Sequence, residues 1–230
     1  MIVALLFALS LHEVGHAYAA KRNGDLTAHS MGRITLNPLK HLDPVGTLMM
    51  VFVGFGWAKP VPVNPNNFED RKKGMLQVSL GGVAVNFVLI ILSLGLLLLT
   101  AQIGFSTGTL TNSPETFGSI LTMLFFNIFL YSILLNAILM AFNLLPLYPL
   151  DGFRVVQTYA RPNNRYVLFM ERHGLKILFG ILLTGAVARI LADAAWEGFR
   201  FFDILGLYIN AVATGIMRMV DAIWGAVFGV

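Results

Sequence analysis

The sequence contains no cysteine among its 230 residues, and charged residues make up only 12% of it. Without cysteine, neither a disulfide framework nor a thiolate metal site can form, so any metal must be bound by histidine and carboxylate side chains. The low charge accompanies 57% hydrophobic residues, well above an ordinary soluble domain. The composition therefore predicts a polytopic membrane protein that contacts the lipid bilayer. The net charge of +4 is small, and we expect no nucleic-acid partner.

Long apolar runs separated by short polar connections account for most of the chain. A helix needs about 20 apolar residues to cross the hydrocarbon layer. The runs predict about five transmembrane helices, at residues 2–20, 75–100, 118–145, 174–192 and 201–230. No cleavable signal is evident, because the first run lacks a basic start. We expect one membrane domain over residues 1–230, with a core at 1–155 and additional membrane helices at 156–230.

Three segments differ from a simple long apolar run. Val45–Ala58 is apolar but only 14 residues long, which predicts a re-entrant segment that enters the membrane and returns. Leu26–Leu36 is polar with partial alternation, which predicts a short β-hairpin at the membrane surface. The last helix has a polar face that either packs inward or lies at the membrane interface. The members of that face are Asn210, Thr214, Arg218 and Asp221. The predicted fold is an all-α polytopic membrane protein with these two additional segments.

The first apolar run contains the pattern H-E-x-x-H, at His12, Glu13 and His16. On a helix, residues four apart lie on one face, so both imidazoles can reach one metal ion. Glu13 is placed to take a proton from metal-bound water rather than to bind the metal. Such polar groups are costly in a membrane helix, at roughly 2.5–3.5 kcal/mol for an acidic residue near its centre. The pattern therefore favours a metal site over a set of buried structural side chains.

A second polar group follows the predicted helix at 118–145, in the stretch that ends at Asp151 and Gly152. Pro146 and Pro149 break the helix, and Gly152 permits a tight turn. Asp151 therefore comes directly after a membrane span.

Other polar residues have two interpretations each. His41 and Asp43 are either additional ligands or turn and capping groups at the start of the re-entrant segment. Asn86 shares a helix face with Gly82, and it either joins neighbouring helices by hydrogen bonds or orients a substrate.

Basic residues are distributed unevenly along the chain. If Val45–Ala58 enters the membrane and returns, one side of the membrane receives 13 of the 16 lysines and arginines. These lie in the segments 21–43, 59–73 and 154–176. The positive-inside rule makes that side cytoplasmic. The same arrangement allows His12, His16 and Asp151 to meet near one membrane depth.

Together these features resemble the site-2 protease family, the intramembrane zinc metalloproteases of peptidase family M50. The resemblance rests on the pattern at His12 and His16 and on the Leu-Asp-Gly motif at Asp151. The stretches 41–47 and 55–64 are similar to the compact prokaryotic branch, which lacks PDZ and CBS domains. The resemblance implies one Zn²⁺ per chain, with Asp151 as its third ligand. It also implies a multi-pass protein of the prokaryotic inner or plasma membrane, with the site towards the cytoplasm.

The implied activity is that of a zinc metalloendopeptidase that hydrolyses peptide bonds within or near transmembrane segments. Single-span membrane proteins are the expected substrates. Two imidazoles and one carboxylate leave zinc an open position for water, and Glu13 serves as the general base. A donor to the developing oxyanion is also expected. Asn143 and Asn86 are candidates, although Asn143 is equally interpreted as a cap at the broken helix end.

Two other classes of protein compete with this interpretation. A transporter or metal carrier would use the histidines and aspartate as an ion site, but it would need a second cluster or repeated halves, and the sequence has neither. An inactive scaffold is disfavoured because His12, Glu13, His16 and Asp151 are all present. Leu26–Leu36 is interpreted either as a surface linker or as a strand to which unwound substrate adds. Oligomeric state does not follow from the sequence.

Overall fold

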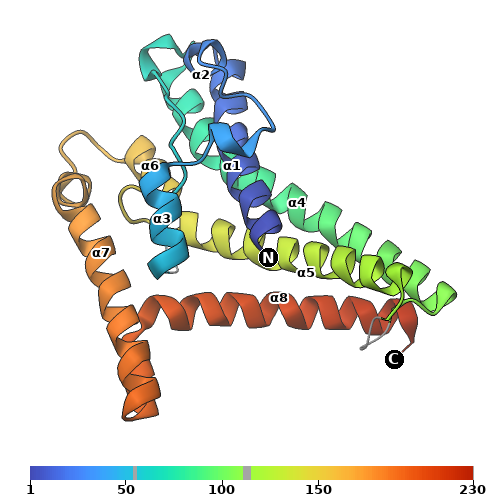
Figure 1. Ribbon diagram of the computed structural model, residues 1–230. Helices are drawn as coiled ribbons and strands as arrows, with labels where there is room; N and C mark the ends of the chain where they lie inside the picture. Colours follow the sequence, from blue (N-terminus) through green and yellow to red (C-terminus); the bar gives the residue numbers. More distant parts are fainter. Residues whose placement is uncertain (54–55, 111–114, 230) are drawn as a thin grey trace.

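The computed structural model describes residues 1–53, 56–110 and 115–229, apart from the side chains of residues 50–53. Within these described ranges, five helices are long and apolar enough to cross a membrane, which confirms the predicted number (Figure 1). They are α1 (Ile2–Arg22), α4 (Arg71–Thr107), α5 (Phe117–Asn143), α7 (Arg165–Ala194) and α8 (Ile204–Phe228). Shorter elements connect them: α2 (Thr27–Ser30), α3 (Pro44–Val53), α6 (Asp151–Tyr159), and the 3₁₀ turns η1 (Pro38–Lys40), η2 (Pro65–Asn67) and η3 (Glu197–Phe202).

α1 crosses α4 at a pair of glycines. A Cβ atom on Gly15 would lie 2.5 Å from the carbonyl oxygen of Gly81. Because neither residue has a side chain, the two helix backbones come into direct contact there. This contact fixes the position of α1 along α4, and with it the height of the histidines on α1.

α8 runs antiparallel along α5. The Tyr208 hydroxyl, near the start of α8, donates to the carbonyl of Ala141, near the end of α5. At the other end, the Trp224 ring contacts the Phe126 ring, with 5.8 Å between their centres. α7 stands to the side of this group of helices, at the left of Figure 1.

Capping side chains and prolines set the ends of the helices that form the site. Asp70 accepts hydrogen bonds from the N–H groups of Lys72 and Lys73 and so begins α4. α4 contains 37 residues, and at about 1.5 Å per residue it is longer than the hydrocarbon layer is thick. α5 ends at Asn143, shortly before Pro146, as the proline predicts.

The β-hairpin predicted over Leu26–Leu36 is wrong. The segment begins with α2 and continues as turns, and no strand occurs in the ranges that the structure describes. The Thr27 N–H donates to the Asp25 carboxylate, and the Arg33 N–H donates to the Ala28 carbonyl. These local bonds supply partners for the backbone without a second strand, which partial alternation of polar residues does not reveal.

The re-entrant segment predicted at Val45–Ala58 is not supported. Its first part belongs to α3, a helix of 10 residues, and residues 54 and 55 lie outside the described structure. The two ends of the segment do meet. The Lys59 N–H donates to the His41 carbonyl at 2.7 Å, and an isolated antiparallel bridge joins Leu42 to Ala58. The segment is therefore a closed loop that contains a short helix.

The connections after α1, before α4 and after α6 gather at one end of the molecule. The Asn64 N–H donates to the Asp25 carboxylate at 2.7 Å, which joins the first two connections. The Lys72 ammonium lies 4.8 Å from the centre of the Tyr159 ring, which joins the start of α4 to the end of α6. The three basic segments of the sequence are thus neighbours in space.

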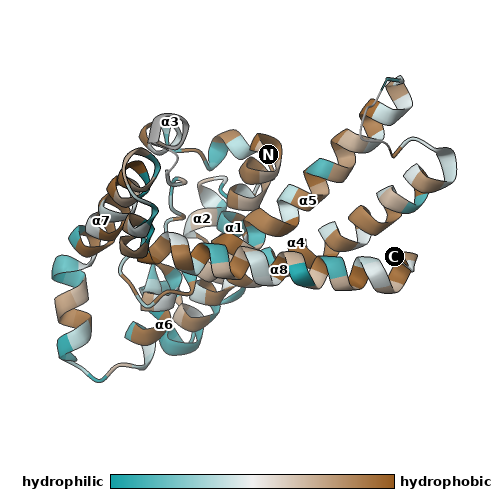
Figure 2. Cartoon of the chain, turned by 90° about the horizontal axis from the view of Figure 1, so that it is seen from below, coloured by the Kyte–Doolittle hydropathy of each residue, from teal (hydrophilic) through white to brown (hydrophobic). Residues whose placement is uncertain are grey.

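The outer surface is strongly apolar, and hydrophobic residues predominate along the long helices in Figure 2. Large side chains such as Phe117 and Leu183 are 80% and 67% exposed, as expected of a surface that contacts lipid rather than water. The polar face of α8 is exposed rather than packed inward, whereas Val220 is buried.

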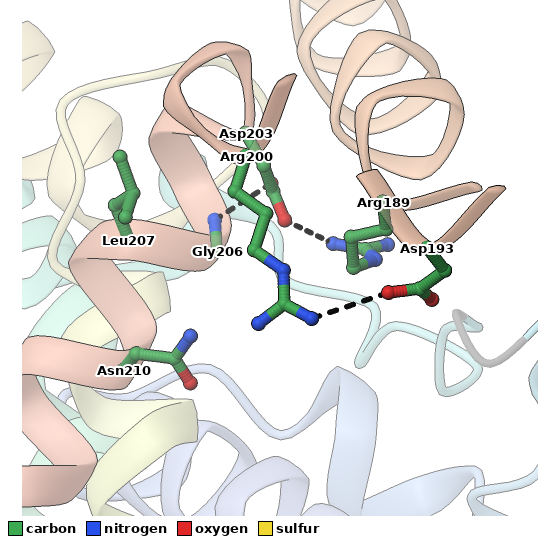
Figure 3. Close-up of a pocket in the computed structure, with 7 residues that line it drawn as sticks. All are labelled: Arg189, Asp193, Arg200, Asp203, Gly206, Leu207 and Asn210. Carbon is green, nitrogen blue, oxygen red and sulfur yellow. Dashed lines mark hydrogen bonds and ion pairs between the residues drawn. The ribbon is translucent and has the colours of Figure 1, made fainter. Parts of the chain in front are cut away.

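Two ion pairs connect α7 with the turn η3 and the start of α8, around a cavity of about 190 Å³ (Figure 3). The Arg189 guanidinium donates to the Asp203 carboxylate at 2.6 Å, and Asp203 also accepts from the Gly206 N–H, which caps α8. The Arg200 guanidinium donates to Asp193 at 3.1 Å. Both arginines are paired with acids, so the junction holds the turn between the helices.

Candidate metal centre

α1 carries both histidines on the face that it turns towards α4. His12 and His16 are separated by one helical turn, and their rings meet edge to face with centres 4.6 Å apart. Gly82 on α4 makes room for the His12 ring, because a Cβ atom there would lie 2.5 Å from Cε1 of His12. The ring of His12 therefore fills a space that glycine leaves open.

Asp151 reaches the histidines from the start of α6. After α5 ends, the chain turns through the prolines, and Asp151 is the first residue of the next helix. Gly152 lies within the first turn of α6 rather than in the predicted tight turn. A Cβ atom on Gly152 would lie 2.2 Å from the Leu144 carbonyl oxygen. Glycine is needed here for the close approach of α6 to the end of α5, and this approach places Asp151.

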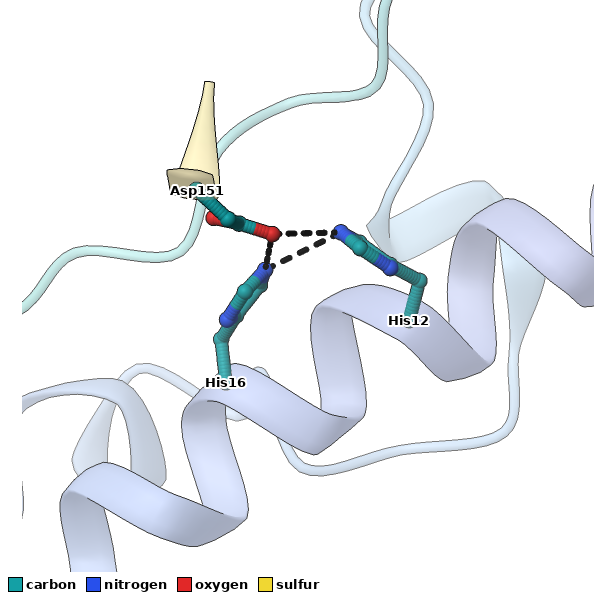
Figure 4. A group of neighbouring side chains, drawn as sticks. All are labelled: His12, His16 and Asp151. Carbon is teal, nitrogen blue, oxygen red and sulfur yellow. Dashed lines mark hydrogen bonds and ion pairs between the residues drawn. The ribbon is translucent and has the colours of Figure 1, made fainter. Parts of the chain in front are cut away.

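The three side chains converge on one point (Figure 4). Nε2 of His12 and Nε2 of His16 are 3.0 Å apart, and each lies 3.3 Å from Oδ2 of Asp151. All three residues are buried, with 5%, 8% and 7% of their surfaces exposed. In the described part of the chain this is the one group of three or more such side chains whose ligand atoms lie within 4.8 Å of one another.

Hydrogen bonds determine which atom of His16 faces the cluster. Its Nδ1–H donates to the Val78 carbonyl at 2.7 Å, so the Nε2 lone pair points towards His12 and Asp151. Nδ1 of His12 is buried, with no hydrogen-bond partner among the described residues. Asp151 turns Oδ2 towards the Nε2 atoms of both rings.

The geometry of these donor atoms fits a zinc ion. Zinc bound by two imidazoles and one carboxylate has bonds of about 2.0–2.1 Å, so its tetrahedral ligands lie roughly 3.3 Å from one another. The observed separations are 3.0 and 3.3 Å. Oδ2 of Asp151 is buried, without a suitably oriented hydrogen-bond donor in the described structure. A cation between the three atoms would satisfy it.

Glu13 lies beside this cluster and does not join it. Its Oε2 accepts a hydrogen bond from the Val61 N–H at 3.1 Å. Val61 belongs to the extended segment Lys59–Asn64, which follows the loop that contains α3. The carboxylate is therefore held by the backbone of another segment.

The other predicted candidates lie in different surroundings. Asp43 accepts a hydrogen bond from the Gly46 N–H and caps α3, and His41 donates from Nε2 to the Thr35 carbonyl at 2.9 Å. Both therefore have the structural role that was the alternative to metal binding. The Asn143 amide donates to the Leu139 carbonyl of its own helix at 3.0 Å.

Asn86 is fully buried, and neither atom of its amide group has a hydrogen-bond partner among the described residues. The bond across helices that its structural interpretation requires is thus not found there. Asn86 lies one helical turn beyond Gly82, on the face of α4 that contacts His12.

Some residues of the site were not predicted from the sequence. The Val78 carbonyl and the Val61 N–H are backbone groups, for which side-chain patterns give no signal. Arg33, which holds the segment that contains Val61, lies in Leu26–Leu36, where the sequence pattern predicts a hairpin. Gly82 differs from these groups, because glycines in a membrane helix predict close approach by a neighbouring helix.

The fold and the cluster indicate a multi-pass membrane protein with a candidate metal site of two histidines and one aspartate. The profile of peptidase family M50 matches residues 1–186, and the chain belongs to that family, as the resemblance implied. It is 37% identical over 191 residues to "Putative zinc metalloprotease YwhC" of Bacillus subtilis (strain 168), covering 80% of each chain.

Further relatives extend over nearly the whole chain. It is 29% identical to "Putative zinc metalloprotease Rip2" of Mycolicibacterium smegmatis, over 99% of this chain and 82% of the relative. It is 31% identical to the protein of the same name of Mycobacterium tuberculosis (strain ATCC 25618 / H37Rv), over 97% of this chain and 81% of the relative. No solved structure gives a significant match. The names of these relatives, together with the donor set, imply Zn²⁺ as the cofactor.

Proposed function

We propose that the chain is an intramembrane zinc metalloprotease, which hydrolyses peptide bonds within or near the transmembrane segments of membrane proteins. The observation that carries this proposal is the convergence of His12, His16 and Asp151 within a buried cluster on a membrane helix. Family membership supports a metalloprotease. The position of the cluster on a membrane helix favours substrates that lie in the bilayer.

His12, His16 and Asp151 would hold the zinc ion through Nε2, Nε2 and Oδ2. Zinc, when bound, supplies Lewis-acid polarisation and lowers the pKa of a coordinated water to about 7. Glu13 accepts the proton of the attacking water on its carboxylate and delivers it to the leaving amine. Glu13 suits this role because it lies beside the cluster but does not contribute to it.

The depth of the site supports a substrate within the membrane. His12 lies about 15 Å along α1 from its first residue, at about 1.5 Å per residue, which is near the middle of the hydrocarbon layer. The basic segments gather at the end of the molecule where α1 ends, and the positive-inside rule supports a cytoplasmic location for that end. Single-span proteins of a prokaryotic plasma membrane are therefore the proposed substrates.

Asn86 is the better candidate for the donor to the oxyanion. Its amide is buried and has no described acceptor, so it remains available to a substrate carbonyl. The amide of Asn143 is already bonded to Leu139. Asn86→Ala is therefore expected to lower kcat more than Asn143→Ala does.

A metal carrier is not favoured as the function. Transfer of an ion across the membrane requires several sites along a path, and the described residues contain one such cluster. Uptake of Zn²⁺ into vesicles that contain the purified protein would nevertheless support a carrier and count against the protease.

The test uses the purified full chain in lipid vesicles. Zinc is measured by mass spectrometry, and cleavage is measured on a model single-span substrate and on an unstructured soluble peptide. We expect about one zinc ion per chain and cleavage of the membrane substrate that a zinc chelator abolishes and added zinc restores. Cleavage of the soluble peptide alone would overturn the intramembrane assignment.

Substitutions separate the roles within the cluster. Glu13→Gln removes the base but leaves the ligands, so we expect normal zinc content and loss of cleavage by a factor of about 100 or more. His12→Ala, His16→Ala and Asp151→Ala are expected to lose both zinc and activity. Cleavage by Glu13→Gln at the normal rate would contradict this mechanism.

A further inference from the structure

A single peptide group connects Glu13 to a buried arginine. The Val61 N–H donates to Oε2 of Glu13 at 3.1 Å, and the carbonyl of the same peptide group belongs to Pro60. That carbonyl accepts a hydrogen bond from Nη1 of Arg33 at 3.3 Å. Because a peptide group is planar and its N–H and C=O point in opposite directions, it bridges the guanidinium and the carboxylate.

Arg33 is held in this position by a second hydrogen bond. Its Nη2 donates to the Lys59 carbonyl at 2.6 Å, so two consecutive carbonyls bind one guanidinium. Only 5% of the Arg33 surface is exposed, and in the described ranges it forms no ion pair with a carboxylate. A buried guanidinium that binds only carbonyl groups and no carboxylate costs free energy. We infer that this cost is retained because the guanidinium fixes the backbone of Lys59–Val61.

We propose that Arg33 is a positioning residue for Glu13. The guanidinium orients and polarises the Pro60–Val61 peptide group, and the Val61 N–H then fixes Oε2 of Glu13 and leaves Oε1 free for the attacking water. Consecutive hydrogen bonds strengthen one another in a region of low dielectric constant. This inference rests on the proposed function, because it assigns Glu13 the role of base.

The rest of the segment is held independently of Arg33. The Lys59 N–H donates to the His41 carbonyl, and the Asn64 N–H donates to Asp25. Loss of the guanidinium should therefore release the peptide group between these two anchors without unfolding the segment. The expected defect is local, at Val61 and Glu13.

The first experiment measures the Val61 amide itself and does not depend on catalysis. The chain is labelled with ¹⁵N-valine in detergent, and the Val61 signal is identified by its loss in Val61→Ile. In Arg33→Gln we expect Val61 hydrogen exchange to become about tenfold faster, with zinc content unchanged. Arg22→Gln is the matched control, since Arg22 is an exposed arginine that forms no hydrogen bond or ion pair with Lys59–Asn64 in the described structure. Unchanged exchange of Val61 in Arg33→Gln would overturn the proposal.

The second experiment separates positioning from general stability. We expect Arg33→Gln to lower kcat about 10- to 100-fold with KM and zinc content unchanged, because misplacing a catalytic group costs rate rather than binding. Arg33→Lys, which keeps the charge but not the two-carbonyl geometry, should lie between wild type and Arg33→Gln.

A double-mutant cycle tests whether Arg33 acts on Glu13 through the Val61 N–H. Val61→Pro removes the N–H that reaches Glu13, so Arg33→Gln should cost little further activity in that variant. Independent, multiplicative losses would show that Arg33 acts elsewhere and would overturn the proposal. If wild type cleaves no membrane substrate, the proposed function fails, while the exchange of Val61 still decides whether Arg33 positions that peptide group.

Discussion

Gly82 lies directly against the ring of His12, so the packing of α4 against α1 determines where this proposed metal ligand can lie. A Cβ atom there would lie 2.5 Å from Cε1 and 2.6 Å from Nε2 of His12, closer than van der Waals contact allows. The ring therefore cannot keep its place beside any larger residue. Since Nε2 is the atom that faces His16 and Asp151, displacement of the ring acts directly on the proposed metal site.

Gly82→Ala is expected to lower zinc affinity at least tenfold while the chain still folds, because the new methyl group pushes one ligand out of position. Gly95→Ala is the control on the same helix, since no described atom lies within 4 Å of its Cβ position. It should bind zinc normally and be slightly more stable, by about 0.5–1 kcal/mol. Equal zinc affinity in the two variants, measured by competition with a chelating dye, would contradict the assigned contact.

In the turn after α1, one buried carboxylate joins several connecting elements. Asp25 is fully buried and accepts four hydrogen bonds, from the N–H and hydroxyl of Thr27, the N–H of Asn64 and the amide of Asn67. It thereby ties α1 and α2 to the segment that leads into α4. The same bonds hold the far end of Lys59–Asn64, which contacts Glu13.

The stability of this connection should depend on pH. Burial alone raises the pKa of the Asp25 carboxyl, but the hydrogen bonds from Thr27, Asn64 and Asn67 outweigh it and hold that pKa below its ordinary value of 3.8. Because the folded pKa is lower than the unfolded one, the stabilisation is complete above about pH 4 and is lost as the pH falls through the folded pKa.

Thermal unfolding in detergent between pH 7 and pH 3 measures this contribution. The wild type should be more stable than Asp25→Asn at pH 7, and the difference should shrink below about pH 4. Glu69→Gln, at an exposed acid nearby, serves as the control. A difference between wild type and Asp25→Asn that is constant down to pH 3 would refute the linkage.

For the whole molecule, the arrangement of the connections implies an orientation in the membrane. The segments before α4 and after α6 are joined by the contact of Lys72 with Tyr159, whereas α4 ends at Thr107 at its far end. The first two segments carry many basic residues, and the far end carries few. The positive-inside rule therefore predicts that the first group is cytoplasmic.

Single cysteines in this cysteine-free chain test the orientation. Asn66→Cys and Pro162→Cys should react with a membrane-impermeant thiol reagent from the cytoplasmic side only, and Ser106→Cys should react from the opposite side only. Inverted and right-side-out vesicles provide the two measurements. Labelling of Asn66→Cys and Ser106→Cys from the same side would contradict the orientation.

Properties that depend on neighbours along the chain can be predicted from the residue pattern. The number of membrane helices follows from runs of apolar residues, and the shared face of His12 and His16 follows from helical periodicity. The end of α5 before Pro146 follows from the geometry of proline. The pattern at Leu26–Leu36 predicts a hairpin wrongly, because Asp25 accepts local hydrogen bonds from Thr27 that the alternation of polar residues does not reveal.

Which distant groups meet depends instead on how the helices and connections pack together. Periodicity places the histidines on one face of α1, but the approach of Asp151 depends on Gly152 packing against Leu144. The Val61 N–H on Glu13 and the guanidinium of Arg33 behind it involve backbone atoms, which every residue except proline presents alike. The positions of these backbone groups follow from how the chain packs. A sequence pattern cannot predict them, because the backbone N–H and C=O are the same in nearly every residue.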